Sequence, residues 1–545
     1  MLSHGLVAAD KRTVAVTGRN MEVRAIQFTT LHRRHPIFIS AFSALALALI
    51  PLACDAPPQP PALVNWETPH VHPIDLTPNT ALLLAVNTPD NRLELFAATD
   101  DGLSPLGAIP VSLDPVTVRA RSNTEAWVVN HISDSISVVD LESRQVVATL
   151  HVGDEPCDVV FAGSPMRAFV TLSQENRVRV YNPDDLSAEP TTLDIEGEDP
   201  RALAVAPDGS RIYAAIFESG NATTLVPHYD VSNPDGPYGG QNPPPNAGAD
   251  FAPAIAPSAI NPPPVGQIVR KIDGHWIDIN GADWSAKVFW DLHDHDVAII
   301  DANTLDITYA AGLMNIDMNL AVHPSGSVTV IGSEAINEIR FEPNLRGTFA
   351  RMVMATFDPL VPDSAVIRDL NPHLDYTKAS IPNNQRKRSI SDPRSIVWNA
   401  AGSRAYIAGM GSDNVIVIDE FGDRIAELSV PAGPTGLALD ESRNRLLVLS
   451  KFDASVTIID TSNNAVNETL SFFDPTLKPS SAAVRICTTR PNHLRSARCP
   501  APPAMSMPAW IRSRGTSATR PARRRNSTSP AASAPFSFPA RIGIP

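Results

Sequence analysis

The chain has 545 residues and a formal net charge of −14, but its charge is unevenly spread. Residues 1–53 hold 6 basic and 2 acidic side chains, and residues 484–545 hold 11 arginines with no Asp, Glu or Lys. Residues 54–483 hold the remaining 27 basic and 56 acidic side chains, a net charge of about −29. A body this acidic repels phosphates, which argues against nucleic acid as a partner.

The N-terminal part has the features of an export signal. Arg33-Arg34-His35 precedes an apolar run from Ile37 to Leu52, which ends at the small residue Ala53. The run is shorter than the roughly 20 residues that a transmembrane helix needs. We therefore predict a signal peptide over residues 1–53, with Met21 as the true start, and an extracytoplasmic protein of the bacterial periplasm or cell surface.

Cys54 follows this signal directly. Leu52-Ala53-Cys54 resembles a bacterial lipobox, in which the Cys is acylated and becomes the mature N-terminus; Pro51 departs from that pattern, which prefers Leu. Residues 54–65 form a Pro-rich tether. We favour lipidation of Cys54, which makes the membrane a partner through the lipid anchor. Simple cleavage near Ala53, with Cys54 an ordinary residue, is the alternative.

A strand–turn–strand motif then recurs along the chain. Its copies are Glu125 to Asp140, Arg404 to Asp419 and Arg445 to Asp460, each with a short polar turn and a second strand that ends in Asp. A spacing of roughly 40 residues with this content is typical of propeller blades. We predict an all-β fold, a β-propeller of about seven blades over residues 66–475. We expect ring closure to pair the stretch after Trp66 with the last blade.

Two segments interrupt the repeats. Residues 228–292 are rich in Pro, Gly and Asn, and residues 357–393 contain the basic stretch Arg386-Lys387-Arg388. Long insertions on a rigid scaffold often carry function, and a solvated loop is the alternative for both. The repeated Asp140, Asp301, Asp419 and Asp460 predict a structural turn role because they close equivalent strands.

The repeats resemble the YVTN/YncE-type bacterial β-propellers, through elements such as Val128-Val129-Asn130 and Val417-Ile418-Asp419. Three further stretches look similar to exported propellers fused to a C-terminal c-type cytochrome domain: 69–73, 129–135 and 294–298. That resemblance implies a Cys-x-x-Cys-His haem attachment site after the propeller. The chain as written has no such motif and therefore no expected cofactor.

The tail over residues 476–545 changes character abruptly, because acidic residues vanish after Asp474. A disordered basic tail is one interpretation. The other is a frameshift: with the reading frame moved, Cys499 to Ala518 can encode Cys-x-x-Cys-His followed by a cytochrome-like string. Haem c is then the cofactor of the restored frame.

Candidate site residues are few. His293 and His295 alternate, so on a strand they share a face and offer two ligands to a transition metal; a plain polar strand is the alternative. His70, His72 and His131 are candidates to line the mouth of the ring. Cys157 is expected to be a small buried hydrophobe. No catalytic residue is assigned, since the motifs of hydrolases, zinc proteases and nucleotide-binding loops are absent.

Three functions follow from these features. For the chain as written we favour a binding scaffold that is no enzyme, exported and lipid-anchored, with a protein or small-molecule ligand at a propeller face. The second is redox: the propeller half of a cytochrome c fusion, acting in electron transfer or peroxidase-like chemistry. The third is a lactonase-like propeller enzyme, which requires clustered carboxylates and His at one mouth of the ring.

Overall fold

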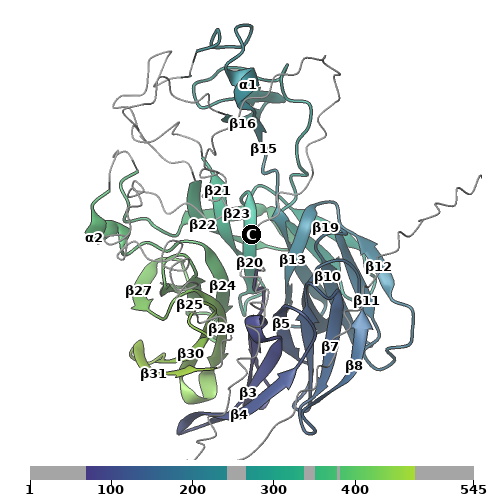
Figure 1. Cartoon of the computed structure of the whole chain (residues 1–545). Helices are drawn as coiled ribbons and strands as arrows, with labels where there is room; N and C mark the ends of the chain where they lie inside the picture. The colour runs from purple at the N-terminus through teal and green to yellow at the C-terminus, as the bar shows by residue number, and fades with distance from the viewer. Residues whose placement is uncertain (1–68, 242, 244–265, 337–349, 377–380, 473–545) are drawn as a thin grey trace, which may run out of the picture. The chain divides into compact units, whose positions relative to one another are not determined.

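The computed structural model describes residues 69–241, 243, 266–336, 350–376 and 381–472. Its strands form four-stranded antiparallel sheets in which neighbours in sequence pair in order (Figure 1). The first three are β1 (Ile74–Leu76), β2 (Leu82–Asn87), β3 (Arg92–Thr99) and β4 (Gly102–Pro110); β5 (Pro115–Ala120), β6 (Glu125–Asn130), β7 (Ser135–Asp140) and β8 (Gln145–His151); and β9 (Pro156–Ala162), β10 (Arg167–Leu172), β11 (Arg177–Tyr181) and β12 (Thr191–Asp194).

Two further four-stranded groups are joined by a single pair between β14 and β20. They are β13 (Glu198–Val205), β14 (Arg211–Glu218), β18 (Val297–Asp301) and β19 (Ile307–Ala310), then β20 (Ile316–Val322), β21 (Val328–Ala335), β22 (Ala350–Asp358) and β23 (Val361–Asp369). The last two sheets are β24 (Pro393–Trp398), β25 (Arg404–Gly409), β26 (Asn414–Asp419) and β27 (Arg424–Ser429), then β28 (Pro434–Asp440), β29 (Arg445–Ser450), β30 (Ser455–Asp460) and β31 (Ala465–Ser471). Short helices are η1 (Thr88–Asp90), α1 (His228–Val231), α2 (Asn383–Arg386) and η2 (Glu441–Arg443).

The first strands of these groups make a closed ring. β1, β5, β9, β13, β20, β24 and β28 contact one another in that order, and β28 contacts β1. The predicted all-β propeller is therefore confirmed. The expected mode of closure is wrong: β1 pairs with β2, and the last sheet is built from residues 434–471 alone. Apolar side chains of the first and last groups, among them Phe96 and Leu447, pack together instead.

Burial explains which strands look apolar in the sequence. The second strand of a group is covered on both faces by the neighbouring groups, so Trp127, Val128 and Val129 are all fully buried. The fourth strand lies at the edge of its sheet, and β8 alternates between exposed and half-buried residues. Inner strands therefore read as continuous apolar runs, and outer strands read as alternating ones.

The aspartates that end the third strands have the predicted turn role. Asp140 Oδ1 accepts a hydrogen bond from Ser143 N at 2.6 Å, and Asp460 Oδ1 accepts one from Ser462 N at 2.8 Å. Asp301 and Asp419 bind the backbone of their own turns in the same manner. Repetition of a residue across blades here reflects turn geometry.

The second predicted insertion begins later than expected. Residues 357–393 were assigned to it, but β22 ends at Asp358 and β23 occupies Val361–Asp369. Pro362 and the polar residues of this stretch resemble a loop in sequence. They are compatible with β23 because it is an edge strand, where a missing backbone N–H breaks no ladder.

The first insertion is more than a solvated loop. Three strands, β15 (Thr223–Val226), β16 (Gln267–Ile272) and β17 (His275–Ile277), form a separate antiparallel sheet between β14 and β18. Trp276 and Trp284 are buried in an apolar cluster of its own. We call residues 223–290 the insertion module, of which 242 and 244–265 lie outside the described residues.

Candidate functional site

One face of the ring collects the long connections. In each group, the turn from second to third strand and the link to the next group lie at the end where the first strand begins. The insertion module and the link 370–392 that contains α2 both leave the ring at that end. We call it the loop face, and the end with the remaining turns the opposite face.

The chain enters the ring from the loop face. His70 lies beside Thr88, just after β2, and Thr435, at the start of β28: the ring nitrogens are 2.6 Å from Thr88 Oγ1 and 2.8 Å from Thr435 Oγ1. Thr88 donates its own hydroxyl proton to Pro115 O at 2.6 Å. His70 Nε2 must therefore carry the hydrogen donated to Thr88, and Nδ1 accepts from Thr435.

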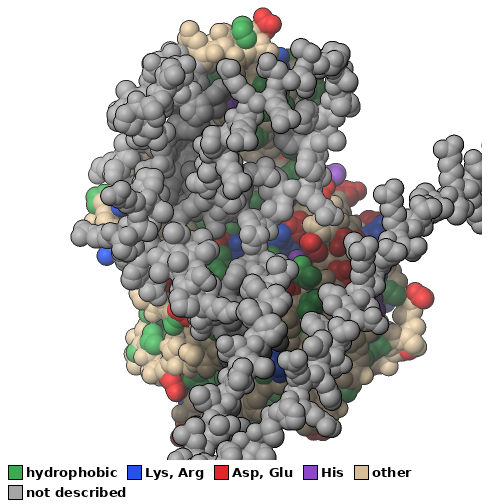
Figure 2. Space-filling view, in the orientation of Figure 1, with side chains coloured by type: hydrophobic (Ala, Val, Ile, Leu, Met, Phe, Trp, Pro, Cys, Tyr) green, Lys and Arg blue, Asp and Glu red, His purple; other side chains and the backbone are tan. Residues whose placement is uncertain are grey.

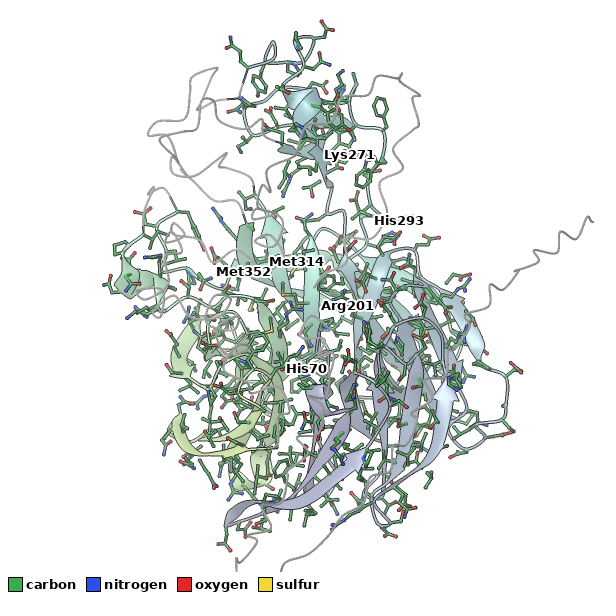
Figure 3. The ribbon with its side chains drawn as sticks, viewed as in Figure 1. His70, Arg201, Lys271, His293, Met314 and Met352 are labelled. Carbon is green, nitrogen blue, oxygen red and sulfur yellow. The ribbon has the colours of Figure 1, made fainter. Side chains whose placement is uncertain are left out.

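Residues 70–73 continue along the inner side of the ring. Val71 N donates to Val116 O on β5, and Asn319 Nδ2 on β20 donates to Val71 O at 3.0 Å. Burial, then Lys451 and Arg394, holds the pKa of His70 well below its usual range. His70 is thus a neutral clamp between the first and last groups, and Figure 3 labels it toward the middle of the ring.

His72 belongs to a charged network deeper in the ring. Its Nε2 lies 3.0 Å from Arg119 Nη1, and Arg119 forms a bidentate pair with Asp158 at 2.9 and 3.1 Å. Asp158 Oδ2 also accepts a hydrogen bond from Leu203 N at 2.9 Å. Burial and Arg119 lower the pKa of His72 well below its usual range, so the ring is a neutral acceptor for the guanidinium.

His131 lies in the turn after β6, at the loop face. Its Nδ1 donates to Pro156 O at 3.1 Å, its Nε2 is 3.6 Å from Glu155 Oε2, and burial lowers its pKa to about 4. Cys157 Sγ is 3.8 Å from Nδ1. Cys157 is fully buried, as predicted, and burial raises the pKa of its thiol to about 12.

Sequence reasoning missed a buried ion pair beside these residues. Arg201 binds Asp199 through Nε at 2.8 Å and Nη2 at 2.5 Å, while its guanidinium carbon lies 3.7 Å from the centre of the Phe217 ring. Asp392 and Arg394 repeat the arrangement, with Nε to Oδ1 at 2.7 Å. The signal was available, since Asp-Pro-Arg occurs at 199–201 and at 392–394, each time at the start of a first strand.

Glu218 ends β14 on the same face, next to Phe217. Burial, and after it the charge of Asp199, raises the pKa of Glu218 to about 7. Figure 2 shows acidic side chains gathered with basic and His side chains on the visible surface near β12, β13 and β19. The loop face therefore does bring His131, Glu155, Asp199, Arg201 and Glu218 to one side of the ring.

A second pair of carboxyl groups is buried where the module meets the ring. Asp296 and Asp317 are both fully buried, and both oxygens of the Asp317 carboxyl group lack a hydrogen-bond partner among the described residues. Asp296 also accepts Leu313 N at 2.9 Å. Burial raises the pKa of Asp296 to about 6, and burial together with Asp296 raises the pKa of Asp317 well above its usual range. Because burial and the neighbouring carboxyl group both favour the protonated form, this pair keeps protons to a higher pH than exposed carboxyl groups do.

The insertion module is a small folded unit attached to the ring. Asp278 Oδ2 accepts hydrogen bonds from Tyr238 OH at 2.5 Å and from Trp284 Nε1 at 2.9 Å. Arg270 pairs with Glu334 of β21 at 2.8 Å, which joins module and ring. Figure 3 labels Lys271 within the module and His293 on its return toward the ring.

The module exposes large apolar side chains. Phe289 is 85% exposed and Trp290 is 59% exposed, although the two are adjacent and follow a buried core. Tyr229, Leu225, Ile279 and Ile272 are also exposed apolar residues of the module. Phe289 and Trp290 are neighbours in sequence, and large apolar side chains exposed together are typical of an interaction site.

His293 and His295 lie in the return segment and not on a strand, since β18 begins at Val297. Their rings stack at 5.9 Å, and the His295 ring stacks on Tyr309 at 4.0 Å. His295 Nδ1 donates to Glu196 O at 2.6 Å. Within the described ranges, no group of three or more His, Cys, Asp or Glu side chains is arranged to hold a metal ion.

The link that contains α2 is held firmly at its backbone. Asn371 donates to Ile390 O at 2.9 Å and accepts Ile390 N at 2.7 Å, and Arg424 Nη2 donates to Arg388 O at 2.7 Å. Ile390 is fully buried. Arg386, Lys387 and Arg388 are exposed on this fixed backbone.

Several predictions fall on other parts of the chain. Cys54, the signal peptide and the tether, and the tail with Cys487 and Cys499, lie outside the described residues. Among the helices that the structure does describe, none has the length and apolar character of a membrane span.

No protein-family model matches the chain, and no curated protein matches its sequence. Solved structures with a similar fold include Kuenenia stuttgartiensis hydrazine synthase, at 16% identity and a TM-score of 0.48 over 74% of this chain and 99% of that one. Apo AztD from Citrobacter koseri is similar at 12% identity and 0.40, over 72% and 94%. A protein from Desulfotomaculum acetoxidans is similar at 13% identity and 0.39, over 72% and 96%. Likeness at this level carries no statement about the ligand or activity of this chain.

Proposed function

We propose that this protein is an exported, lipid-anchored β-propeller that binds a partner protein through its insertion module. The observation that carries the proposal is the exposure of Phe289 and Trp290 on a module that has its own buried core. A solvated connection needs neither a core nor exposed aromatic residues. Aromatic side chains are enriched where proteins bind one another, because they bury much apolar area at a small cost in conformational entropy.

Attachment of the module to the ring supports the same function. The Arg270–Glu334 pair is one attachment. Asn315 makes a second one, because its Nδ2 donates to Gly220 O at 3.0 Å and to Thr223 Oγ1 at 2.5 Å. A surface held in this way loses little freedom when a partner binds. Export and lipidation of Cys54 rest on the N-terminal sequence, and acylation is tested by the mass of the mature N-terminal peptide.

The partner is tested by site-specific photocrosslinking in intact cells. A photoreactive amino acid replaces Phe289 in one strain, and Phe421 in a control strain. Phe421 is matched because it is 63% exposed and lies in the turn between β26 and β27, on the opposite face. We expect a discrete protein adduct from position 289 only, and the same adduct when the probe is placed in the identified partner. Equal adducts from both positions would refute the proposal.

A small-molecule ligand at the loop face is the second candidate. It is favoured by the group formed by His131, Glu155, Asp199, Arg201 and Glu218, because ionisable groups with shifted pKa values gather at functional sites. A lactonase-like enzyme is expected to cluster carboxylates and His at one mouth of the ring, so this group is the place to test that alternative. Hydrolysis of a panel of lactones is compared between the wild type and a Glu218→Gln variant. Equal rates would refute a lactonase-like function at this group. The redox function remains a proposal for the restored reading frame.

A further inference from the structure

We propose that the loop face is turned toward a lipid bilayer and that Arg386, Lys387 and Arg388 contact its anionic headgroups. The proposal rests on the lipid anchor of the proposed function, and it adds the orientation of the ring and the chemistry of the contacted surface. The partner of the insertion module then lies in or on the same membrane. α2 is the green helix at the left of Figure 1.

Arg386, Lys387 and Arg388, which we call the basic triplet, are positively charged in an otherwise acidic part of the chain. Residues 54–483 carry a net charge of about −29, whereas 381–391 hold three basic residues and no acidic one. All three side chains are exposed, and no ion pair found within the described ranges includes them. An acidic body is repelled by an anionic bilayer, so a contact requires a local basic surface that faces the headgroups.

The triplet is also fixed in place. The backbone of Arg388 is held by Arg424, and that of Gln385 by His373, whose Nε2 lies 3.1 Å from Gln385 O. Ile390 and Ile381 bury their side chains on either side of the triplet. The three charges therefore project from a defined part of the loop face and do not need to be ordered on binding.

The described part of the chain begins at the same face. His70 sits among Thr88, Pro115 and Thr435, all at the end where first strands begin, and β1 runs from there into the ring. Cys54 precedes Pro69 by 15 residues, which span at most about 50 Å when fully extended. A bilayer that holds the acyl chains of Cys54 is therefore within reach of the loop face.

The test uses the full chain with a photoreactive amino acid at Lys387, reconstituted into vesicles of equimolar phosphatidylcholine and phosphatidylglycerol. The control position is Arg144, which is exposed in the turn between β7 and β8 on the opposite face. We expect phosphatidylglycerol adducts at position 387 at least about tenfold more often than at 144. Neutralising the neighbours with Arg386→Gln and Arg388→Gln should lower the yield at 387 by roughly fivefold for each charge removed.

The outcomes separate the two proposals. Equal lipid adducts at 387 and 144, or a yield at 387 that the neighbouring neutralisations leave unchanged, would overturn the membrane contact. The same probe at 387 in intact cells would overturn it as well if it gave a protein adduct and no lipid adduct, and would assign the triplet to an acidic protein. If the mature N-terminus is acylated but 387 yields no lipid, the anchor stands and only the orientation is wrong. An unacylated N-terminus refutes the anchor itself.

Discussion

His70 Nδ1 accepts a hydrogen bond from the Thr435 hydroxyl at 2.8 Å, across 365 residues of sequence. This bond links the segment that enters the ring to the start of the last sheet. No strand of the first group pairs with the last group, so the ring is closed here by side chains and by apolar packing. Arg443, which pairs with Asp100, joins the same two groups at their exposed edge, whereas the contacts of His70 are buried.

Replacing His70 with Ala should destabilise the ring. The change removes two buried hydrogen bonds and leaves the Thr435 and Thr88 hydroxyls without their partner, for which we expect a loss of about 2–4 kcal/mol in the free energy of unfolding. Denaturant unfolding followed by tryptophan fluorescence measures it. His275→Ala is the control, because that side chain is 60% exposed and should change stability little. Equal midpoints for both variants would show that His70 does not contribute to closure.

The buried pair of Asp296 and Asp317 predicts a dependence of stability on pH. Both folded-state pKa values are raised, so the contribution of the pair is complete below the ordinary Asp pKa near 4 and is lost as the pH rises through the raised values, about 6 for Asp296. The free energy of unfolding should fall over this window by an amount on the order of 3 kcal/mol.

Asp317→Asn should remove most of this fall, because an amide donates to Asp296 at every pH. The free energy of unfolding of variant and wild type, measured from pH 4 to 8, checks the expectation: the difference between the two proteins should change with pH. Asp101→Asn, an exposed change in the turn between β3 and β4, should keep the wild-type slope. If Asp317→Asn keeps the wild-type change of the free energy of unfolding with pH, groups other than this pair cause it.

The Arg201–Asp199 pair should be costly to break on one side. Arg201→Met leaves the Asp199 carboxylate buried without its cation, for which we expect about 3–5 kcal/mol of destabilisation. Adding Asp199→Asn should restore part of the loss, and a double-mutant cycle measures the coupling. Arg177→Met is the control, since its partner Asp194 is 82% exposed and the pair should contribute less than about 1 kcal/mol. Similar losses for the two arginines would contradict the role given to burial.

The fold was predictable because its signal is local and repeated. Val128, Ile407 and Val448 lie in equivalent apolar strands, each followed by a polar turn and a strand that ends in Asp, so each copy supports the others. β23 was missed because an edge strand needs no apolar run. The apolar cluster of the insertion module was hidden because Trp276 and Trp284 are surrounded by turn-forming residues.

The candidate site was only partly predictable. The sequence predicts His131 at a mouth of the ring, and it does lie at the loop face, but its charged neighbours Arg201 and Asp199 come from another sheet and approach it only in the folded ring. His293 and His295 were expected to alternate on a strand, whereas they precede β18 and stack on each other. Pairwise contacts of this kind depend on ring geometry, which a single blade does not encode.

The insertion module should unfold separately from the ring. Trp284 is fully buried and donates to Asp278, so Trp284→Ala should cost about 3–5 kcal/mol within the module, more than so small a unit can lose. We expect limited proteolysis to cut within 223–290 while the unfolding midpoint of the ring changes little. Trp290→Ala, an exposed neighbour, should leave the pattern of cleavage unchanged. Loss of the whole ring in Trp284→Ala would show that module and ring fold as one unit.

The reading frame of the tail can be settled from the gene. A shifted frame predicts that the DNA downstream of the Asp474 codon encodes Cys-x-x-Cys-His at the place of Cys499, continued without a stop codon by a domain of cytochrome character. Resequencing from Asp474 past Pro545 tests it, and a positive result predicts covalent haem in the corrected protein, seen as a sharp absorbance band after reduction. An early stop in the shifted frame would refute the prediction. The 11 arginines of residues 484–545 would then belong to the native chain and place a basic tail on an acidic ring.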